Sequence, residues 1–131
     1  MKKIVLLLIA LLWLAACAPA GGTAQPITLV SKDINYSTTT LEVTAGQPVA
    51  LTLINEGVLE HDFSIEEIAV TSVSETNPAD HSHAVGDLHA AVKPGETNVL
   101  NFTPTEPGTY EFYCTVAGHK AAGMVGTLIV K

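Results

Sequence analysis

The chain has 131 residues, of which thirteen are acidic, six are lysine and none is arginine, so its net charge at neutral pH is −7. A surface of this sign repels nucleic acid and excludes a nucleic-acid-binding protein. The length is enough for one domain with a real hydrophobic core.

The first sixteen residues predict an export signal. Lys2 and Lys3 precede an apolar run of eleven residues, 4–14, which is too short for a bilayer span of about 20 residues. "LAAC" at 14–17 resembles the lipobox of bacterial lipoproteins, in which cleavage leaves a lipid-modified cysteine at the new N-terminus. We therefore expect a lipoprotein signal peptide over 1–16, with Cys17 as the lipid attachment site. The alternative is an ordinary signal peptide cut elsewhere, with Cys17 removed or free.

Residues 17–26 are small and rich in Pro and Gly, which predicts a flexible tether between the lipid and a domain over 27–131. The exported chain would carry four lysines against thirteen acidic residues, a net charge of −9. It would be anchored to a bacterial membrane and face the periplasm or the cell exterior. Cys114 would then be the one thiol of the exported domain, either buried and inert or bound to something.

Beyond residue 26 the sequence predicts an all-β protein. Short runs of apolar and β-branched residues alternate with turn sequences such as "AGQP", "NEG", "KPGE" and "EPG". About seven strands at this spacing indicate a sandwich or barrel. The predicted strands cover 27–30, 41–44, 49–55, 61–70, 97–103, 109–115 and 125–131.

The segment 71–92 lacks strand periodicity and predicts a long, irregular connection. It contains His81, His83 and His89, and "DHSH" at 80–83 could bind a second copper or zinc ion. No complete ligand set with fixed spacing is visible there, so the favoured interpretation is a solvated polar loop.

A cysteine, a histidine and a methionine follow one another at equal spacing, C-x4-H-x4-M, at Cys114, His119 and Met124. Thiolate, imidazole and thioether are soft or borderline ligands, which suit copper and not calcium or magnesium. A fourth donor would come from elsewhere, and His61 is the candidate. Taken singly, Cys114 could be a small buried hydrophobe, Met124 core filler and His119 an exposed loop residue.

"EHDFSI" at 60–65 and "PGTYEFYCTVAGHKAAGMVGTLIV" at 107–130 resemble the small cupredoxins, the blue copper proteins similar to plastocyanin and azurin. The resemblance implies a Greek-key β-sandwich of seven to eight strands with one type 1 copper. By the same resemblance His61, Cys114 and His119 would bind the copper, and Met124 would be a weak axial ligand. An electron carrier without enzymatic activity is the function that this family implies.

Asp62 departs from the family pattern, in which many members carry Asn directly after the first histidine ligand. We expect the Asp62 carboxylate to accept a hydrogen bond from the Thr115 hydroxyl or from a nearby backbone N–H, which would brace the two ligand loops. A negative charge at this position would stabilise Cu(II) and lower the reduction potential. The alternative is that Asp62 points to solvent.

The alternative function is copper storage or delivery outside the cytoplasm. An oxidase is not expected, because Tyr113 and Thr115 flank Cys114 where the multicopper oxidases carry histidines, and a binuclear copper centre needs two cysteines. The expected partners of a carrier are redox proteins, such as a basic cytochrome c or a membrane-bound respiratory or photosynthetic complex. The carrier itself is expected to be a monomer.

Overall fold

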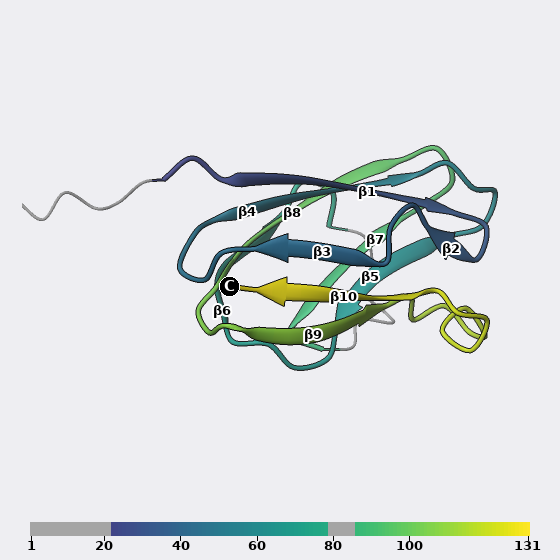
Figure 1. The fold of residues 1–131 in the computed structure, drawn as a ribbon. Coiled ribbons are helices and arrows are strands. Elements are labelled where there is room, and N and C mark those ends of the chain that lie inside the picture. The colour runs from purple at the N-terminus through teal and green to yellow at the C-terminus, as the bar shows by residue number, and fades with distance from the viewer. Residues whose placement is uncertain (1–21, 79–85) are drawn as a thin grey trace, which may run out of the picture.

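The computed structural model of the protein describes residues 22–78 and 86–131. In these two segments every regular element is a β-strand, and none of their residues forms a helix long and apolar enough to cross a membrane. The strands build two layers (Figure 1). In chain order they are β1 (Gln25–Lys32), β2 (Asn35–Tyr36), β3 (Thr40–Val43), β4 (Val49–Asn55), β5 (His61–Ile65), β6 (Val70–Glu75), β7 (Leu88–Val92), β8 (Thr97–Pro104), β9 (Gly108–Tyr113) and β10 (Val125–Val130).

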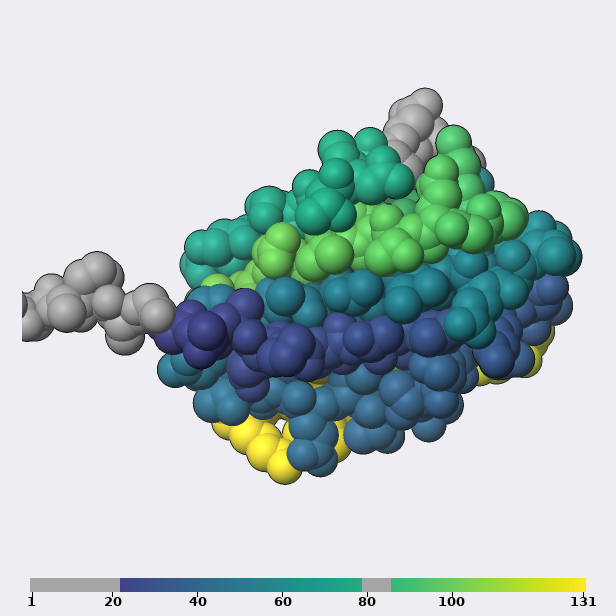
Figure 2. All heavy atoms as spheres, turned by 90° about the horizontal axis from the view of Figure 1, so that it is seen from above, coloured from purple at the N-terminus to yellow at the C-terminus, as the bar shows by residue number. Residues whose placement is uncertain are grey.

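One sheet has the strand order β2-β1-β4-β8-β6, and the other has the order β3-β10-β9-β5-β7. Figure 2 shows the outer face of the first sheet, with β1 in purple, β4 in teal and β8 in green side by side. The pairs β1–β4 and β3–β10 are parallel, whereas the remaining pairs are antiparallel. The chain crosses repeatedly between the sheets, so the predicted all-β Greek-key sandwich is confirmed.

The core lies between the two sheets because the central strands alternate in side-chain polarity. In β4 every second residue is buried, including Leu51 and Leu53, and β8 repeats the pattern opposite it. Phe63 of β5 and Phe112 of β9 are fully buried, with ring centroids 5.1 Å apart. Period-two alternation therefore places one face of each central strand in the core.

The strand count and some boundaries were predicted wrongly. The predicted strand 61–70 ends at Ile65, where residues 66–69 turn the chain into the opposite sheet. The segment predicted to be irregular contains β6 and β7. Sequence alternation missed β6 because it is an edge strand whose residues are all at least partly exposed, and β7 because its side chains are largely small and buried. At the N-terminus β1 begins at Gln25, so the last two residues of the predicted tether belong to the sheet.

The strand pairing brings two distant segments to one end of the sandwich. β9 and β10 are antiparallel neighbours, and β5 is antiparallel to β9 with Ser64 opposite Tyr113. The start of β5, at His61, therefore lies at the same end of the sheet as the residues that follow β9. These residues form the loop 114–124, which joins β9 to β10 at one end of the fold (Figure 1).

Candidate metal centre

The loop 114–124 is closed by its own backbone hydrogen bonds. The Cys114 N–H donates to the Met124 carbonyl at 3.1 Å, and the Met124 N–H donates to the His119 carbonyl at 3.0 Å. Gly118 and Gly123 have φ values of 84° and 99°, a region that residues with a Cβ atom rarely adopt. The fold of the loop therefore places Cys114 and Met124 side by side at the base of the loop, and His119 lies halfway along it in sequence.

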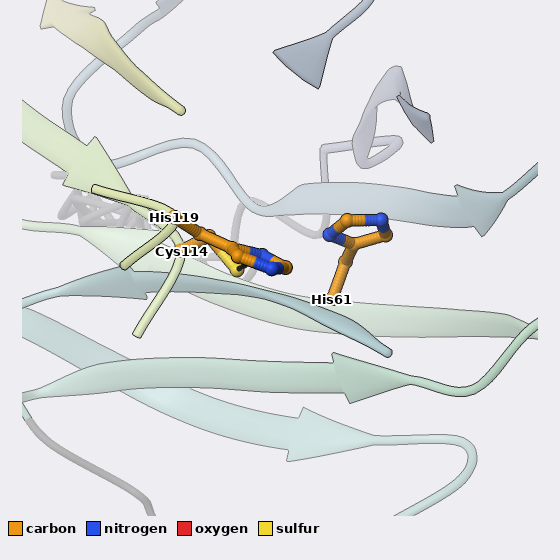
Figure 3. Close-up of side chains that lie close together, drawn as sticks. All are labelled: His61, Cys114 and His119. Atoms are coloured by element: carbon orange, nitrogen blue, oxygen red, sulfur yellow. Dashed lines mark hydrogen bonds between the residues drawn. The ribbon is translucent and has the colours of Figure 1, made fainter. Parts of the chain in front are cut away.

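The structure brings His61 to Cys114 and His119. One potential ligand atom from each of the three side chains lies within 4.8 Å of the other two, and the Cys114 Sγ is 3.4 Å from the His119 Nδ1. Figure 3 shows one ring nitrogen of His61 facing the Cys114–His119 pair. His61, Cys114 and Met124 are fully buried, and His119 keeps 6% of its surface exposed.

Neither ring nitrogen of the buried His61 has a hydrogen-bond partner among the described residues. Asp33 Oδ1 lies 3.5 Å from Nε2, which is longer than a well-formed N–H···O bond. Leaving a buried polar atom unsatisfied costs about 1–3 kcal/mol, so such atoms call for an explanation. Burial also lowers the pKa of His61, so the ring is neutral at neutral pH, the form that binds a metal.

The Cys114 thiol is protonated in the absence of a metal. Burial, followed by the negative charge of Asp62, raises the pKa of Cys114 to about 12. A cation that binds the sulfur must displace the proton, and the affinity for that cation then rises with pH.

Asp62 forms the predicted brace between the two segments that carry the predicted ligands. Its carboxylate accepts hydrogen bonds from the Thr115 N–H, at 2.6 Å, and from the Thr115 hydroxyl. The Tyr36 hydroxyl donates to the Asp62 carbonyl at 2.6 Å, and Asp62 is 4% exposed. The carboxylate is therefore directed into the protein, and the alternative in which it points to solvent is wrong.

His89 does not lie in a solvated loop. It is a residue of β7, its side chain is 7% exposed, and its Nε2 lies 3.3 Å from Asp62 Oδ2. Sequence reasoning missed this pairing, since it follows from the β5–β7 register, in which Ser64 is opposite His89. His81, His83 and the predicted lipid-attachment residue Cys17 lie outside the described residues.

A cavity of about 370 Å³ adjoins this brace. None of the four predicted copper ligands lines it, so it lies beside the ligand cluster and not within it. Its lining consists of Glu60, Asp62, His89, Ala91, Thr115, Val116 and Ala117.

The donor set fits copper. Two imidazoles and one cysteine sulfur in a buried cluster, with a thioether at the end of the same loop, are the ligand types of electron-transfer copper sites. Hard cations such as calcium prefer oxygen ligands, and no carboxylate belongs to the cluster among the described residues. Asp62 lies outside it, with its carboxylate hydrogen-bonded to Thr115.

Comparison with known proteins decides the family. The sequence model described as "Cupredoxin-like domain" matches residues 4–130. The chain belongs to the cupredoxin-like family. Its buried His–Cys–His cluster agrees with the expectation of one copper ion per chain.

Among individual cupredoxin relatives, the copper-resistant cuproprotein CopI of Pseudomonas aeruginosa is 27% identical over 145 residues, 87% of this chain and 80% of that protein. Auracyanin-B of Chloroflexus aurantiacus is 30% identical over 110 residues, 72% of this chain and 46% of that protein. L-ascorbate oxidase of Cucurbita maxima is 34% identical over 95 residues, 70% of this chain but 15% of that enzyme.

The fold agrees with a solved structure, the dithionite-reduced auracyanin of Roseiflexus castenholzii. The two superpose with a TM-score of 0.64 at 23% identity, covering 84% of this chain and 99% of the other. At this identity the likeness supports the cupredoxin fold alone.

Replacing Asp62 by Asn should raise the reduction potential of the copper-loaded protein. The substitution removes a negative charge beside the site and leaves an oxygen that can accept the Thr115 N–H. We expect a rise on the order of 60 mV, which for one electron corresponds to about tenfold in the ratio of Cu(I) to Cu(II) affinity. The measurement is a redox titration at pH 8. Glu67→Gln, in the exposed turn at the far end of β5, is the control and should leave the potential unchanged. An unchanged or lower potential in Asp62→Asn would remove this role of the carboxylate.

Proposed function

We propose that this protein is a one-electron carrier that holds a type 1 copper ion with His61, Cys114, His119 and Met124. The observation that carries the proposal is the buried cluster in which an unpartnered ring nitrogen of His61 faces a thiol and a second imidazole (Figure 3). When bound, copper supplies a couple that accepts and releases single electrons without a proton.

The protein's contribution is a site that is organised before the metal binds. The His61 backbone is fixed in β5, and the loop hydrogen bonds and the Asp62–Thr115 contacts fix the Cys114 side. Because the candidate ligands are buried on these supports, they have little freedom to rearrange when the charge of the ion changes. Burial also keeps water out of the ligand shell, and both effects favour rapid electron transfer.

Electrons would enter and leave at the His119 edge. His119 is the one predicted ligand with an exposed fraction above zero, at 6%. Ala121 and Ala122 follow it on the surface, and Ile34, Val58 and Leu59 are exposed near His61. Small and apolar side chains around the edge of a ligand allow a partner to approach closely without a large desolvation penalty, which suits brief encounters.

Copper loading should produce an intense visible absorption band that depends on Cys114 and disappears on reduction. Cys114→Ser removes the sulfur ligand and should abolish the band and the narrow copper hyperfine splitting in the electron-spin-resonance spectrum. Cys17→Ser is the matched control, since it removes the other cysteine of the chain and should leave both spectra unchanged. Colourless copper-loaded wild-type protein would overturn the proposal.

Copper handling is the second candidate function. The similarity to a copper-resistant cuproprotein favours it, as does the cavity beside the predicted ligands, which His89 and Asp62 help to line. The two functions differ in how tightly the metal is kept. A carrier should retain its copper through repeated oxidation and reduction in the presence of a competing Cu(I) chelator, whereas a delivery protein should lose the metal to the chelator within a few cycles.

We propose no enzymatic activity for this chain. The similarity to L-ascorbate oxidase covers a small part of that enzyme. The residues beside Cys114 are Tyr113 and Thr115, and neither offers a ligand for a neighbouring copper cluster. Addition of a phenolic or ascorbate substrate to the aerobic copper protein should therefore cause no oxygen uptake above that of a Cys114→Ser control.

We also propose that the protein is exported and attached to a membrane through Cys17, because residues 1–17 combine a signal sequence with the "LAAC" cleavage motif. Two or more acyl chains anchor stably, at about 0.8 kcal/mol per buried CH₂. Cys17→Ala should move the protein from the membrane fraction to the soluble fraction, as measured by fractionation and immunoblotting. Wild-type protein that is already soluble would contradict the anchor.

The net charge of −9 expected after signal removal suits a basic redox partner, such as a cytochrome c, near a respiratory or photosynthetic complex. Electrostatic steering of this kind raises association rates by about 10- to 1,000-fold and fades with salt. Stopped-flow electron transfer with a basic cytochrome c should slow steeply as the ionic strength rises. Rates that do not depend on salt would contradict the steering.

A further inference from the structure

The two ring nitrogens of His61 face different directions, and only one of them faces the other predicted ligands. One ring nitrogen faces Cys114 and His119, while the other points away from them (Figure 3). The Asp33 Oδ1 lies 3.5 Å from Nε2. Nε2 is therefore the nitrogen on the Asp33 side, which leaves Nδ1 for the metal. The nitrogen that is not a ligand needs a hydrogen-bond acceptor if the ring is to keep one tautomer and one orientation.

The Asp33 carboxylate is held in place by the loop that leads to His61. The same Oδ1 accepts hydrogen bonds from the backbone N–H groups of Val58, at 2.9 Å, and Leu59, at 3.2 Å. The loop is fixed from its other side by Asn55, whose side-chain amide donates to the Leu59 carbonyl at 2.7 Å. Asp33 thus belongs to the turn after β1 but is fixed to the segment that precedes β5.

Two backbone features accommodate Asp33 at this position. Ile34, the second residue of the two-residue turn between β1 and β2, has a φ of 62°, which is unusual for a β-branched side chain. Gly57 lies against the carboxylate, and a Cβ atom there would collide with Asp33 Oδ1. The position of Asp33 is therefore constrained on two sides. Its own turn is held in an unfavourable conformation, and the loop that contacts its carboxylate needs glycine at position 57.

The carboxylate is ionised at neutral pH. The Asp33 side chain is 43% exposed to water, and the hydrogen bonds that it accepts from the Val58 and Leu59 N–H groups stabilise the charged form. A carboxylate that faces Nε2 favours the tautomer with hydrogen on Nε2, because the other tautomer would direct a lone pair at a negative charge.

We propose that Asp33 is the positioning residue of the His61 ligand. Its carboxylate accepts the Nε2 hydrogen, so that Nδ1 carries no proton and is directed at Cys114 and His119. This inference rests on the proposed copper function, but it concerns the ring in the metal-free protein as well. It was not visible in the sequence, because Asp33 lies 28 residues before His61 in a short turn.

The test is nitrogen-15 nuclear magnetic resonance of histidine-labelled protein, first without metal and then loaded with diamagnetic Cu(I). In the wild type we expect His61 to carry a slowly exchanging Nε2 hydrogen and an unprotonated Nδ1. In Asp33→Ala this hydrogen should exchange rapidly, with both tautomers populated. The Cu(II) affinity of Asp33→Ala, measured by competition with a chelator, should fall by about 10- to 100-fold.

Asp33→Asn distinguishes the loss of the carboxylate charge from a loss of loop structure. Its amide oxygen can still accept the Val58 and Leu59 N–H groups, so the loop keeps its anchor while the charge is lost. We expect a normal circular dichroism spectrum, a weaker preference for the Nε2–H tautomer and a Cu(II) affinity about tenfold below that of the wild type. Asp87→Asn is the matched control, because Asp87 accepts the Ile68 N–H beyond the other end of β5, and it should bind copper within about twofold of the wild type.

The proposal is overturned if wild-type His61 carries its hydrogen on Nδ1, or if both Asp33 variants match the wild type in ring signals and Cu(II) affinity. Failure of the proposed function gives a different result. Wild-type protein would then show no thiolate-dependent colour with copper, whereas the metal-free spectra would still report whether Asp33 fixes the ring.

Discussion

The contact between Asp62 and Thr115 is the interaction on which the site depends. It joins the start of β5, where His61 lies, to the first residues after β9, where Cys114 lies, across 53 positions of sequence. Strand pairing brings these two segments to the same end of the sandwich, but the pairing leaves their side chains free to turn. The carboxylate, which receives both the N–H and the hydroxyl of Thr115, removes that freedom.

Around this brace the protein satisfies its buried polar groups but leaves a ring nitrogen of His61 without a partner among the described residues. Asp62, Asn55 and Asn98 are buried and hydrogen-bonded, whereas the buried His61 nitrogen that faces Cys114 and His119 has no hydrogen-bond partner among the described residues. Such a difference between neighbouring buried groups indicates that the interior is arranged for a ligand and not for maximum stability. Copper is the ion that matches the donors, and the membership of the cupredoxin-like family agrees with it.

The sequence predicted the parts of this account that depend on local pattern. Period-two alternation located the central strands, and the spacing of Cys114, His119 and Met124 located the loop that carries three of the predicted ligands. Alternation could not find β6, whose residues are all at least partly exposed, or the two-residue β2. Neither could it find the roles of His89 and Asp33. The contacts of His89 with Asp62 and of Asp33 with His61 join segments that are remote in sequence. These segments meet through strand register and turn geometry, which produce no periodic pattern in the sequence.

We propose that the site is formed before copper arrives and keeps its shape when the charge of the ion changes. Crystal structures of the metal-free, Cu(I) and Cu(II) forms, in one crystal form, test it most directly. We expect the ligand atoms of His61, Cys114 and His119 to agree among the three structures within about 0.5 Å, with Asp62 still hydrogen-bonded to Thr115. A metal-free structure in which the His61 ring has turned away, or in which the loop 114–124 has opened, would contradict it.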